Sequence, residues 1–129
     1  MKFRYKKFSP AVLRPVVPVA IKVNNNMIMY EVLIDSGADM CIFDAEIGEV
    51  LGLNIEQGEP HPVAGVIAGQ RAFYYNHSVT LIVGGVRYDT VVGFSRHISR
   101  CGYGIVGQRG FFDKFIVKFD LRKEEVELK

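Results

Sequence analysis

The sequence predicts an all-β protein, built as a closed or barrel-like sheet with one or two short helices. Short apolar or β-branched runs of strand length recur along the chain, and turn-forming Asn and Gly residues separate them. Few segments carry the start, spacing and stop signals of a helix. With 129 residues, 49% of them hydrophobic and 23% charged, the chain is expected to fold as a single domain over residues 1–129.

The first long pair of strands is predicted to form a hairpin. Residues 16–23 and 27–34 are apolar runs of strand length, and three asparagines at 24–26 separate them. Asparagine tolerates the left-handed backbone conformation that tight hairpin turns require. The core of the domain is therefore expected to span about residues 16–129, and residues 1–15 are interpreted as an extension at its N-terminal end.

A short helix is predicted after these strands. In DAEIGEVLG, Asp44 is a capping residue, apolar side chains recur at helical spacing as far as Leu51, and Gly52 is a stop signal. Residues 60–94 are then predicted to form consecutive strands, with a turn at Gly84-Gly85 between the last two.

The last part of the sequence alternates short strands with polar connections. Residues 95–102 form a polar connection, GYGIVG is a short apolar strand, and QRGFFDKF can make one helical turn. The closing segment FIVKFDLRKEEVELK predicts a strand, a charged turn and a final strand. These two strands are expected to form a hairpin within the chain, a contact sheet between two subunits, or both.

Composition and charge argue against several classes of function. The formal net charge of +2 is too small to indicate a nucleic-acid partner. No apolar stretch approaches the ~18 residues of a membrane span, and the basic start lacks the apolar run of a secretory signal. The chain is therefore expected to be cytoplasmic, with Cys41 and Cys101 reduced, although a longer membrane-anchored parent stays an open alternative.

The stretch VLIDSGAD, residues 32–39, carries the strongest chemical signal. An apolar strand leads into Asp35, and Ser36 and Gly37 follow at once. The glycine permits a tight turn that brings backbone N–H groups towards the carboxylate, and the Ser36 hydroxyl can bond to a neighbouring loop. A carboxylate held in this way can activate a water molecule. The alternative is an ordinary turn, in which the aspartate bonds only its own backbone.

The longer pattern resembles the retropepsin family of aspartic proteases, especially its cellular, non-viral members. VLIDSGAD is similar to the family's first motif, two apolar residues followed by Asp-Thr/Ser-Gly-Ala-Asp. A glycine-bearing hairpin follows, and GIVGQRGFF is similar to the later motif, in which apolar residues and a glycine lead into a short helix. The resemblance covers roughly residues 16–120. It implies the closed β-barrel of the acid protease fold, in a dimer.

The resemblance also implies roles for individual residues. Asp35 would be the catalytic carboxylate, and Ser36 would make interlocking hydrogen bonds beneath the active site. Gly37 would offer its backbone to a polypeptide substrate, which Ala38 and Asp39 would also contact. For Asp39 two alternatives stay open: a bond to an arginine of the partner subunit, or an ion pair or cap with no role in substrate binding.

Residues 63–69 match the position of the family's flap, a hairpin that closes over bound peptide. The glycines of this segment permit the bending that a lid requires. The resemblance therefore assigns substrate-binding roles to Gly65, Val66, Ile67, Ala68 and Gly69. An ordinary glycine-containing hairpin is the alternative.

One chain provides only half of such an active site. Aspartic protease chemistry needs two carboxylates that share one proton. No other aspartate in the sequence stands in an apolar-Asp-Ser/Thr-Gly context. The implied enzyme is therefore a homodimer in which two copies of Asp35 meet at a two-fold axis, with no metal and no organic cofactor.

Other chemistries find little support in the sequence. The three histidines, His61, His77 and His97, are scattered, and no G-x-S-x-G nucleophile elbow occurs. Cys41 is interpreted as a small core residue, because nothing near it in sequence would activate a thiol. Two non-enzymatic hypotheses remain: a catalytically silent module of the same fold that binds peptide or dimerises, and an unrelated small β-barrel.

Overall fold

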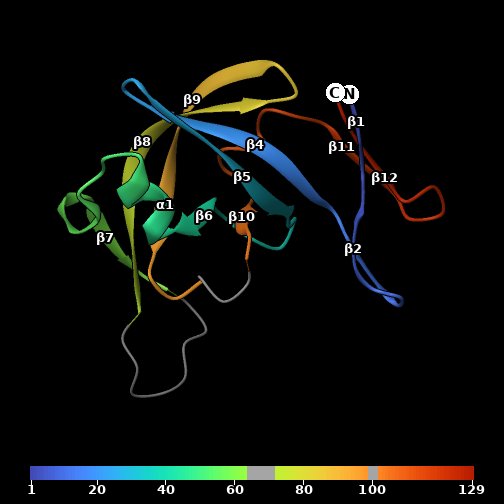
Figure 1. Ribbon diagram of the computed structural model, residues 1–129, viewed down its shortest axis with the longest axis horizontal. Helices are drawn as coiled ribbons and strands as arrows, with labels where there is room; N and C mark the ends of the chain where they lie inside the picture. The colour runs from blue at the N-terminus through green and yellow to red at the C-terminus, as the bar shows by residue number, and fades with distance from the viewer. Residues whose placement is uncertain (64–71, 99–101) are drawn as a thin grey trace.

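The computed structural model describes residues 1–63, 72–98 and 102–129 and consists mostly of strands (Figure 1). One seven-stranded sheet has the order β4-β5-β10-β6-β9-β8-β7, and β4 also pairs with β8. This extra pairing closes six strands into a barrel, so the predicted all-β barrel is confirmed. In chain order the elements are β1 (Lys2–Arg4), β2 (Lys6–Ser9), β3 (Val12–Arg14), β4 (Val16–Val23), β5 (Asn26–Ile34), β6 (Ile42–Asp44), α1 (Ala45–Val50), a 3-10 helix (Ile55–Gln57), β7 (Glu59–Pro62), β8 (Phe73–Val83), β9 (Val86–Ser95), β10 (Gly104–Val106), β11 (Val117–Asp120) and β12 (Glu125–Leu128).

The β4–β5 hairpin and helix α1 form where the sequence predicts them. Asn24 occupies the left-handed region of the hairpin turn, at a φ of 53°. Asp44 caps α1, because its Oδ1 accepts a hydrogen bond from the Glu46 backbone N–H at 3.0 Å. Gly52 follows the helix with a φ of 91°, a conformation that favours glycine.

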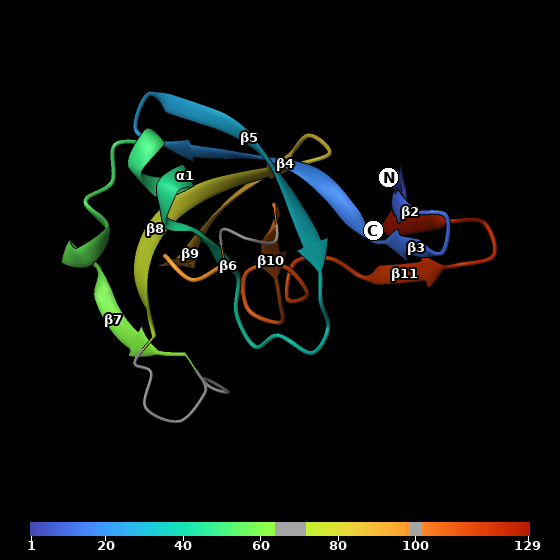
Figure 2. The ribbon, with the colours of Figure 1, turned by 60° about the horizontal axis from the view of Figure 1, so that its bottom comes forward.

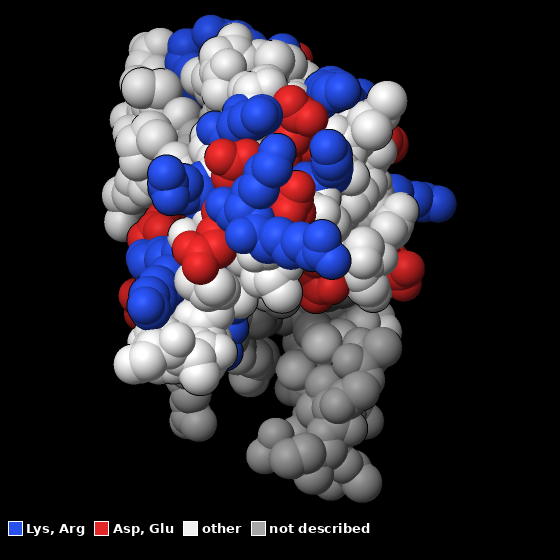
Figure 3. All heavy atoms as spheres, turned by 90° about the vertical axis from the view of Figure 1, so that its right-hand side faces the viewer, with Lys and Arg blue, Asp and Glu red and all other residues white. Residues whose placement is uncertain are grey.

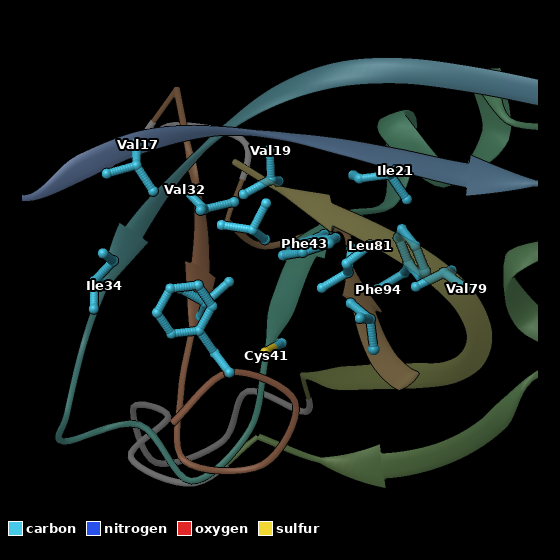
Figure 4. Close-up of a cluster of buried hydrophobic side chains, with 14 of the residues drawn as sticks. Val17, Val19, Ile21, Val32, Ile34, Cys41, Phe43, Val79, Leu81 and Phe94 are labelled. Atoms are coloured by element: carbon cyan, nitrogen blue, oxygen red, sulfur yellow. The ribbon is translucent and has the colours of Figure 1, made fainter. Parts of the chain in front are cut away.

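The hydrophobic core lies inside the barrel. Successive side chains of a strand point to opposite faces, so alternate residues of β4, β5, β8 and β9 face inward (Figure 4). Phe43 and Phe94 meet edge to face at the centre, with ring centroids 6.0 Å apart. Ile34 and Val106 belong to the same core and lie at the ends of β5 and β10, where the candidate site lies.

The two ends of the chain form a second sheet beside the barrel (Figures 1 and 2). Its order is β1-β12-β11, so the predicted C-terminal hairpin is present and β12 has a partner strand on both edges. Phe3 pairs with Val126 and packs against the core. Part of the expected N-terminal extension is thus a strand of this sheet, while β2 and β3 form a hairpin of their own.

Charged side chains of both signs lie on the side of the molecule formed by the terminal sheet (Figure 3). Lys2 and Lys118 flank Glu127 in neighbouring strands, and Lys2 Nζ lies 4.0 Å from Glu125 Oε2. Opposite charges across adjacent strands favour the pairing of those strands. The face is therefore mixed in charge and is no single-sign basic surface.

The segment after β10 makes tight turns and contains no regular helix. The Phe115 N–H donates to the Phe111 carbonyl at 3.1 Å, which gives one turn of helical hydrogen bonding. Gly110 has a φ of 94°, and its N–H donates to Asp113 Oδ1 at 3.1 Å.

Among all the residues that the structure describes, no helix is long and apolar enough to cross a membrane.

Candidate active site

A loop of residues 35–40, named here the DSG loop, follows β5 directly. β5 buries Val32 and Ile34 in the core, and β10 runs parallel to it (Figure 2). The Asp35 N–H donates to the Val106 carbonyl at 3.0 Å, which extends the pairing of β5 with β10 by one residue. Asp35 is therefore anchored at the end of a buried strand, and its side chain is half-buried at the edge of the barrel.

The loop turns back so that its N–H groups face Asp35. The Gly37 N–H donates to Asp35 Oδ1 at 2.9 Å, and the Ala38 N–H donates to the Asp35 carbonyl at 3.2 Å. A Cβ at residue 37 would lie only 3.3 Å from the same carboxylate oxygen. The predicted tight turn is present, and it fixes one oxygen of the Asp35 carboxylate.

Residues 107–109, named here the crossing segment, hold the DSG loop from the side of β10. The Gln108 N–H donates to the Ala38 carbonyl at 2.8 Å, and the Arg109 N–H donates to the Asp39 carbonyl at 3.0 Å. A Cβ at residue 107 would lie 2.7 Å from the Met40 carbonyl oxygen and closer still to that of Ala38. The two segments can approach this closely because residue 107 is glycine.

The other predicted residues of the DSG loop lie near its surface. Ser36, Gly37 and Asp39 are exposed, and Ala38 is half-buried. The Ser36 carbonyl accepts a hydrogen bond from Gln108 Nε2 at 2.7 Å. Within the described part of the single chain, the Ser36 hydroxyl makes no hydrogen bond, so its interlocking role stays a prediction for the dimer.

Asp39 lines a surface hollow beside the DSG loop. The hollow has a volume of about 300 Å³, and its other lining residues are Met40, Gln108 and Arg109. The carboxylate and the guanidinium therefore flank one concave surface at the end of the barrel. Such a surface presents charged groups of both signs side by side.

Apolar side chains stand in a row next to Asp35 on the outward face of the sheet. Ile105 of β10 is opposite Leu33 of β5 on one side and Ile42 of β6 on the other. All three are half-buried, whereas their neighbours along the strands point into the core. An apolar surface thus adjoins the carboxylate.

The stem of the predicted flap is formed by β7 and β8. These strands pair from Glu59↔Asn76 to Pro62↔Phe73, and the Val63 N–H donates to the Ala72 carbonyl at 2.9 Å. The predicted substrate-binding residues of the flap lie outside the described residues: Gly65, Val66, Ile67, Ala68 and Gly69.

Tyr74 connects this stem to the DSG loop. Its hydroxyl donates to Met40 Sδ at 3.4 Å, and its ring stacks on His61 of β7 with centroids 5.3 Å apart. The start of β8 is therefore in contact with the loop that carries Asp35, and His61 near the end of β7 packs on the tyrosine that makes this contact.

Cys41 follows the DSG loop and is buried beneath it. Its Sγ donates to the Arg109 carbonyl at 3.3 Å, and burial raises the pKa of the thiol to about 11. A thiol held in the protonated form is a poor nucleophile, and Cys41 is fully buried, so its interpretation as a core residue is confirmed.

Among the described residues, no group of three or more His, Cys, Asp or Glu side chains could hold a metal ion.

The fold is similar to those of solved protease structures. A retropepsin-like aspartic protease from Rickettsia conorii gives a TM-score of 0.61 at 13% sequence identity, and the match covers 86% of this chain and 88% of that one. The retroviral protease-like domain of Ddi1 from Leishmania major gives 0.54 at 15% identity, with 88% of each chain covered. This chain has the retropepsin fold.

A viral structure supports the same conclusion. The EIAV protease in complex with the inhibitor HBY-793 gives a TM-score of 0.52 at 19% identity, and the match covers 80% of this chain and 88% of that one. No family model and no curated protein sequence matches the chain. At these identities the similarity establishes the retropepsin fold, and the predicted resemblance is confirmed at that level.

Sequence reasoning missed the part that the crossing segment plays in this retropepsin fold. The motif GIVGQRGFF is recognisable in the sequence, but no role follows for Gly107, Gln108 or Arg109 from the letters alone. The signal that could have found them is the glycine after an apolar strand, which often marks a close approach of two backbone segments. The partner in that approach, the DSG loop, becomes apparent only from the three-dimensional structure.

Proposed function

We propose that this protein is an aspartic endopeptidase that works as a homodimer. The observation that carries the proposal is the Asp35 carboxylate, held by the Gly37 N–H at 2.9 Å at the end of a core strand of a retropepsin fold. Aspartic protease chemistry pairs such a carboxylate with a second one, so that one acts as the base and the other as the acid. The second one is assigned to Asp35 of another copy of the chain.

Four other aspartates accept hydrogen bonds from residues close to them in the sequence or on the neighbouring strand. Asp44 caps α1, Asp89 Oδ1 accepts from Thr80 Oγ1 at 2.7 Å, and Asp113 Oδ1 accepts from the Gly110 N–H. Asp120 Oδ1 likewise accepts a backbone N–H, that of Lys123, at 3.1 Å. None of them faces Asp35 through a described contact, which favours a site shared between subunits.

In the proposed reaction, the two Asp35 carboxyl groups hold one proton between them and bind the attacking water. Like charges this close cannot both ionise, so one carboxylate takes a proton from the water while the other donates its proton to the scissile carbonyl oxygen. The water oxygen bonds to the carbonyl carbon and gives a tetrahedral intermediate. In the collapse of the intermediate, the carboxyl that took the water proton gives it to the leaving nitrogen as the C–N bond breaks, and a hydroxyl of the intermediate returns its proton to the other carboxylate as the carbonyl forms again. No covalent enzyme intermediate, metal or organic cofactor is required.

The substrate is proposed to be a polypeptide bound as an extended strand. An apolar substrate side chain would lie against Leu33, Ile42 and Ile105, and the peptide backbone would contact Gly37 and Ala38. For Asp39, which lines the hollow beside the loop, we propose a substrate contact. Ser36 is proposed to interlock the two DSG loops across the two-fold axis.

The closing elements of this proposed site come from the flap segment. Gly65, Val66, Ile67, Ala68 and Gly69 are proposed to cover the bound peptide and exclude water around it. The contact of Tyr74 with Met40 supports this assignment, because it joins the stem of the segment to the DSG loop.

The experiment that tests this function is digestion of a denatured protein or a peptide library at mildly acidic pH. The purified wild-type chain is expected to cleave peptide bonds, and pepstatin, which mimics the tetrahedral intermediate, is expected to block the cleavage. If the wild type shows no cleavage at concentrations where it is dimeric, the catalytically silent peptide-binding or dimerisation module becomes the better reading.

The dimer is proposed to form through the terminal sheet at the β11 side. β12 has partners on both of its edges, whereas β11 is an edge strand. Large apolar side chains are exposed in and next to β11, namely Ile116 at 74%, Phe119 at 42% and Leu121 at 62%. An edge strand offers unpaired backbone groups to another chain, and exposed apolar side chains in and beside it favour such a contact.

Replacing Ile116 with lysine is therefore expected to weaken the dimer. Lysine would bring a strongly hydrated charge to the contact, and we expect the dissociation constant of the dimer to rise by about tenfold, equivalent to about 1.4 kcal/mol. Sedimentation across a concentration series measures this constant. Val86→Lys is the matched control, because Val86 is also an exposed apolar residue, at 43%, but lies at the β8–β9 turn. An equal change in both variants would contradict a contact at β11.

A further inference from the structure

One peptide group in the DSG loop is hydrogen-bonded at both ends. The peptide between Ser36 and Gly37 donates its N–H to Asp35 Oδ1 at 2.9 Å, and its carbonyl accepts from Gln108 Nε2 at 2.7 Å. A peptide group is planar and rigid, so the orientation of the carbonyl also determines the orientation of the N–H. The Gln108 bond to the Ser36 carbonyl therefore acts on the same rigid unit that carries the Gly37 N–H.

The backbone of Gln108 is itself fixed relative to the loop. Its N–H donates to the Ala38 carbonyl at 2.8 Å, and the close approach at Gly107 leaves no space for the crossing segment to slide towards the loop. The Gln108 backbone is thus held at Ala38, and its side-chain amide extends from there to the Ser36 carbonyl. Although Gln108 is exposed, its donor is pre-positioned, which reduces the entropy lost in forming the bond.

We propose that Gln108 is a positioning residue for the candidate active site. Its side-chain amide holds the Ser36–Gly37 peptide so that the Gly37 N–H stays directed at the Asp35 carboxylate. A donor on the carbonyl also polarises the peptide group and strengthens the N–H as a donor at its other end. The effect on catalysis rests on the proposed peptidase function, whereas the effect on the loop does not.

The test uses three replacements of Gln108 that separate donation from size. Gln108→Met keeps the length and removes the donor, Gln108→Glu keeps the shape but presents an acceptor to the Ser36 carbonyl, and Gln108→Lys retains a donor. With a fixed peptide substrate, we expect kcat to fall about tenfold in the Met variant, further in the Glu variant, and no more than about threefold in the Lys variant. KM is expected to change less than kcat, because the bond holds the peptide next to the reacting carboxylate, whereas Gln108 is only one of four residues that line the neighbouring hollow.

A matched control separates this effect from general destabilisation. Gln57→Met makes the same chemical change at an exposed position of the 3-10 helix, away from the DSG loop, and should leave kcat, KM and the thermal midpoint as in the wild type. If kcat is higher in Gln108→Lys than in Gln108→Met, the hydrogen-bond donor at residue 108 is what matters, and not the space that its side chain fills. Equal losses in the Met and Lys variants would overturn the inference.

A second readout needs no enzymatic activity. In the NMR spectrum of the folded protein, the Gly37 amide proton is expected to move upfield in Gln108→Met and to stay near its wild-type position in Gln108→Lys. An unchanged Gly37 resonance in the Met variant would overturn the inference even if cleavage fell. A shifted resonance together with an inactive wild type would uphold the role of Gln108 in the loop and overturn the proposed peptidase function.

Discussion

Replacing Asp35 with asparagine is expected to abolish peptide hydrolysis while the protein stays folded. Asparagine has the same shape, and its side-chain oxygen can still accept the Gly37 N–H that now bonds Asp35 Oδ1. It cannot take a proton from water or share one with a second carboxylate. We therefore expect kcat to fall by about 10⁴-fold or more, with the thermal midpoint nearly unchanged. Asp35→Ala should be equally inactive.

The matched control for this variant is Asp89→Asn. Asp89 is exposed, accepts a hydrogen bond from Thr80 on the neighbouring strand and has no place in the proposed reaction. Its activity should remain within about twofold of the wild type, since surface substitutions are usually small in effect. Both variants need to be compared at the same fraction of dimer, measured by sedimentation. Cleavage that persists in Asp35→Asn and remains sensitive to pepstatin would contradict the assignment of Asp35.

A mixed dimer extends the same argument to the shared site. A dimer with one wild-type and one Asp35→Asn subunit contains a single carboxylate at the axis. It should therefore be as inactive as a dimer in which both subunits carry Asp35→Asn. Titrating the variant into the wild type should therefore reduce activity more steeply than simple dilution does.

The local parts of the fold were predictable because their signals are local. The asparagines at 24–26 indicate the β4–β5 hairpin, in which residues 24 and 25 form the turn and Asn26 begins β5, and Asp44 with Gly52 indicates the start and end of α1. The pairing of β4 with β8, which closes the barrel, leaves no such signal, because it joins strands far apart in the sequence. The same holds for β1 and β12, whose pairing makes residues 2–4 part of a sheet.

The candidate site likewise has one part that the local sequence predicts and one part that depends on the pairing of distant strands. The sequence places Asp35 and the tight turn at Gly37, since both depend on three adjacent residues. It cannot show that residues 107–109 lie against the DSG loop, because this contact depends on the parallel pairing of β5 with β10. The sequence alone therefore predicts no role for Gln108, although its side-chain amide donates a hydrogen bond to the Ser36 carbonyl, next to Asp35.

Replacing Gly107 with alanine is expected to damage both stability and the candidate site. The added Cβ would meet two backbone oxygens, 2.7 Å away at Met40 and closer at Ala38, and backbone atoms cannot rotate aside as a flexible side chain can. Relief requires the DSG loop and the crossing segment to separate, which weakens the bonds of Gln108 and Arg109 to the loop. We expect the free energy of unfolding, measured by urea denaturation, to fall by about 3 kcal/mol.

The comparison with Gly85→Ala separates this steric cost from the cost of backbone conformation. Gly85 has a φ of 87° and open space around its Cα, so alanine there is strained only through its backbone, at about 1 kcal/mol. Gly107 is not among the residues of positive φ, so its cost should come from the contact alone. Because the contact lies under the DSG loop, Gly107→Ala should also reduce kcat/KM by about a hundredfold at temperatures where it is folded, whereas Gly85→Ala should not. Equal stability losses with full activity in both variants would show that the loop does not depend on the close approach at residue 107.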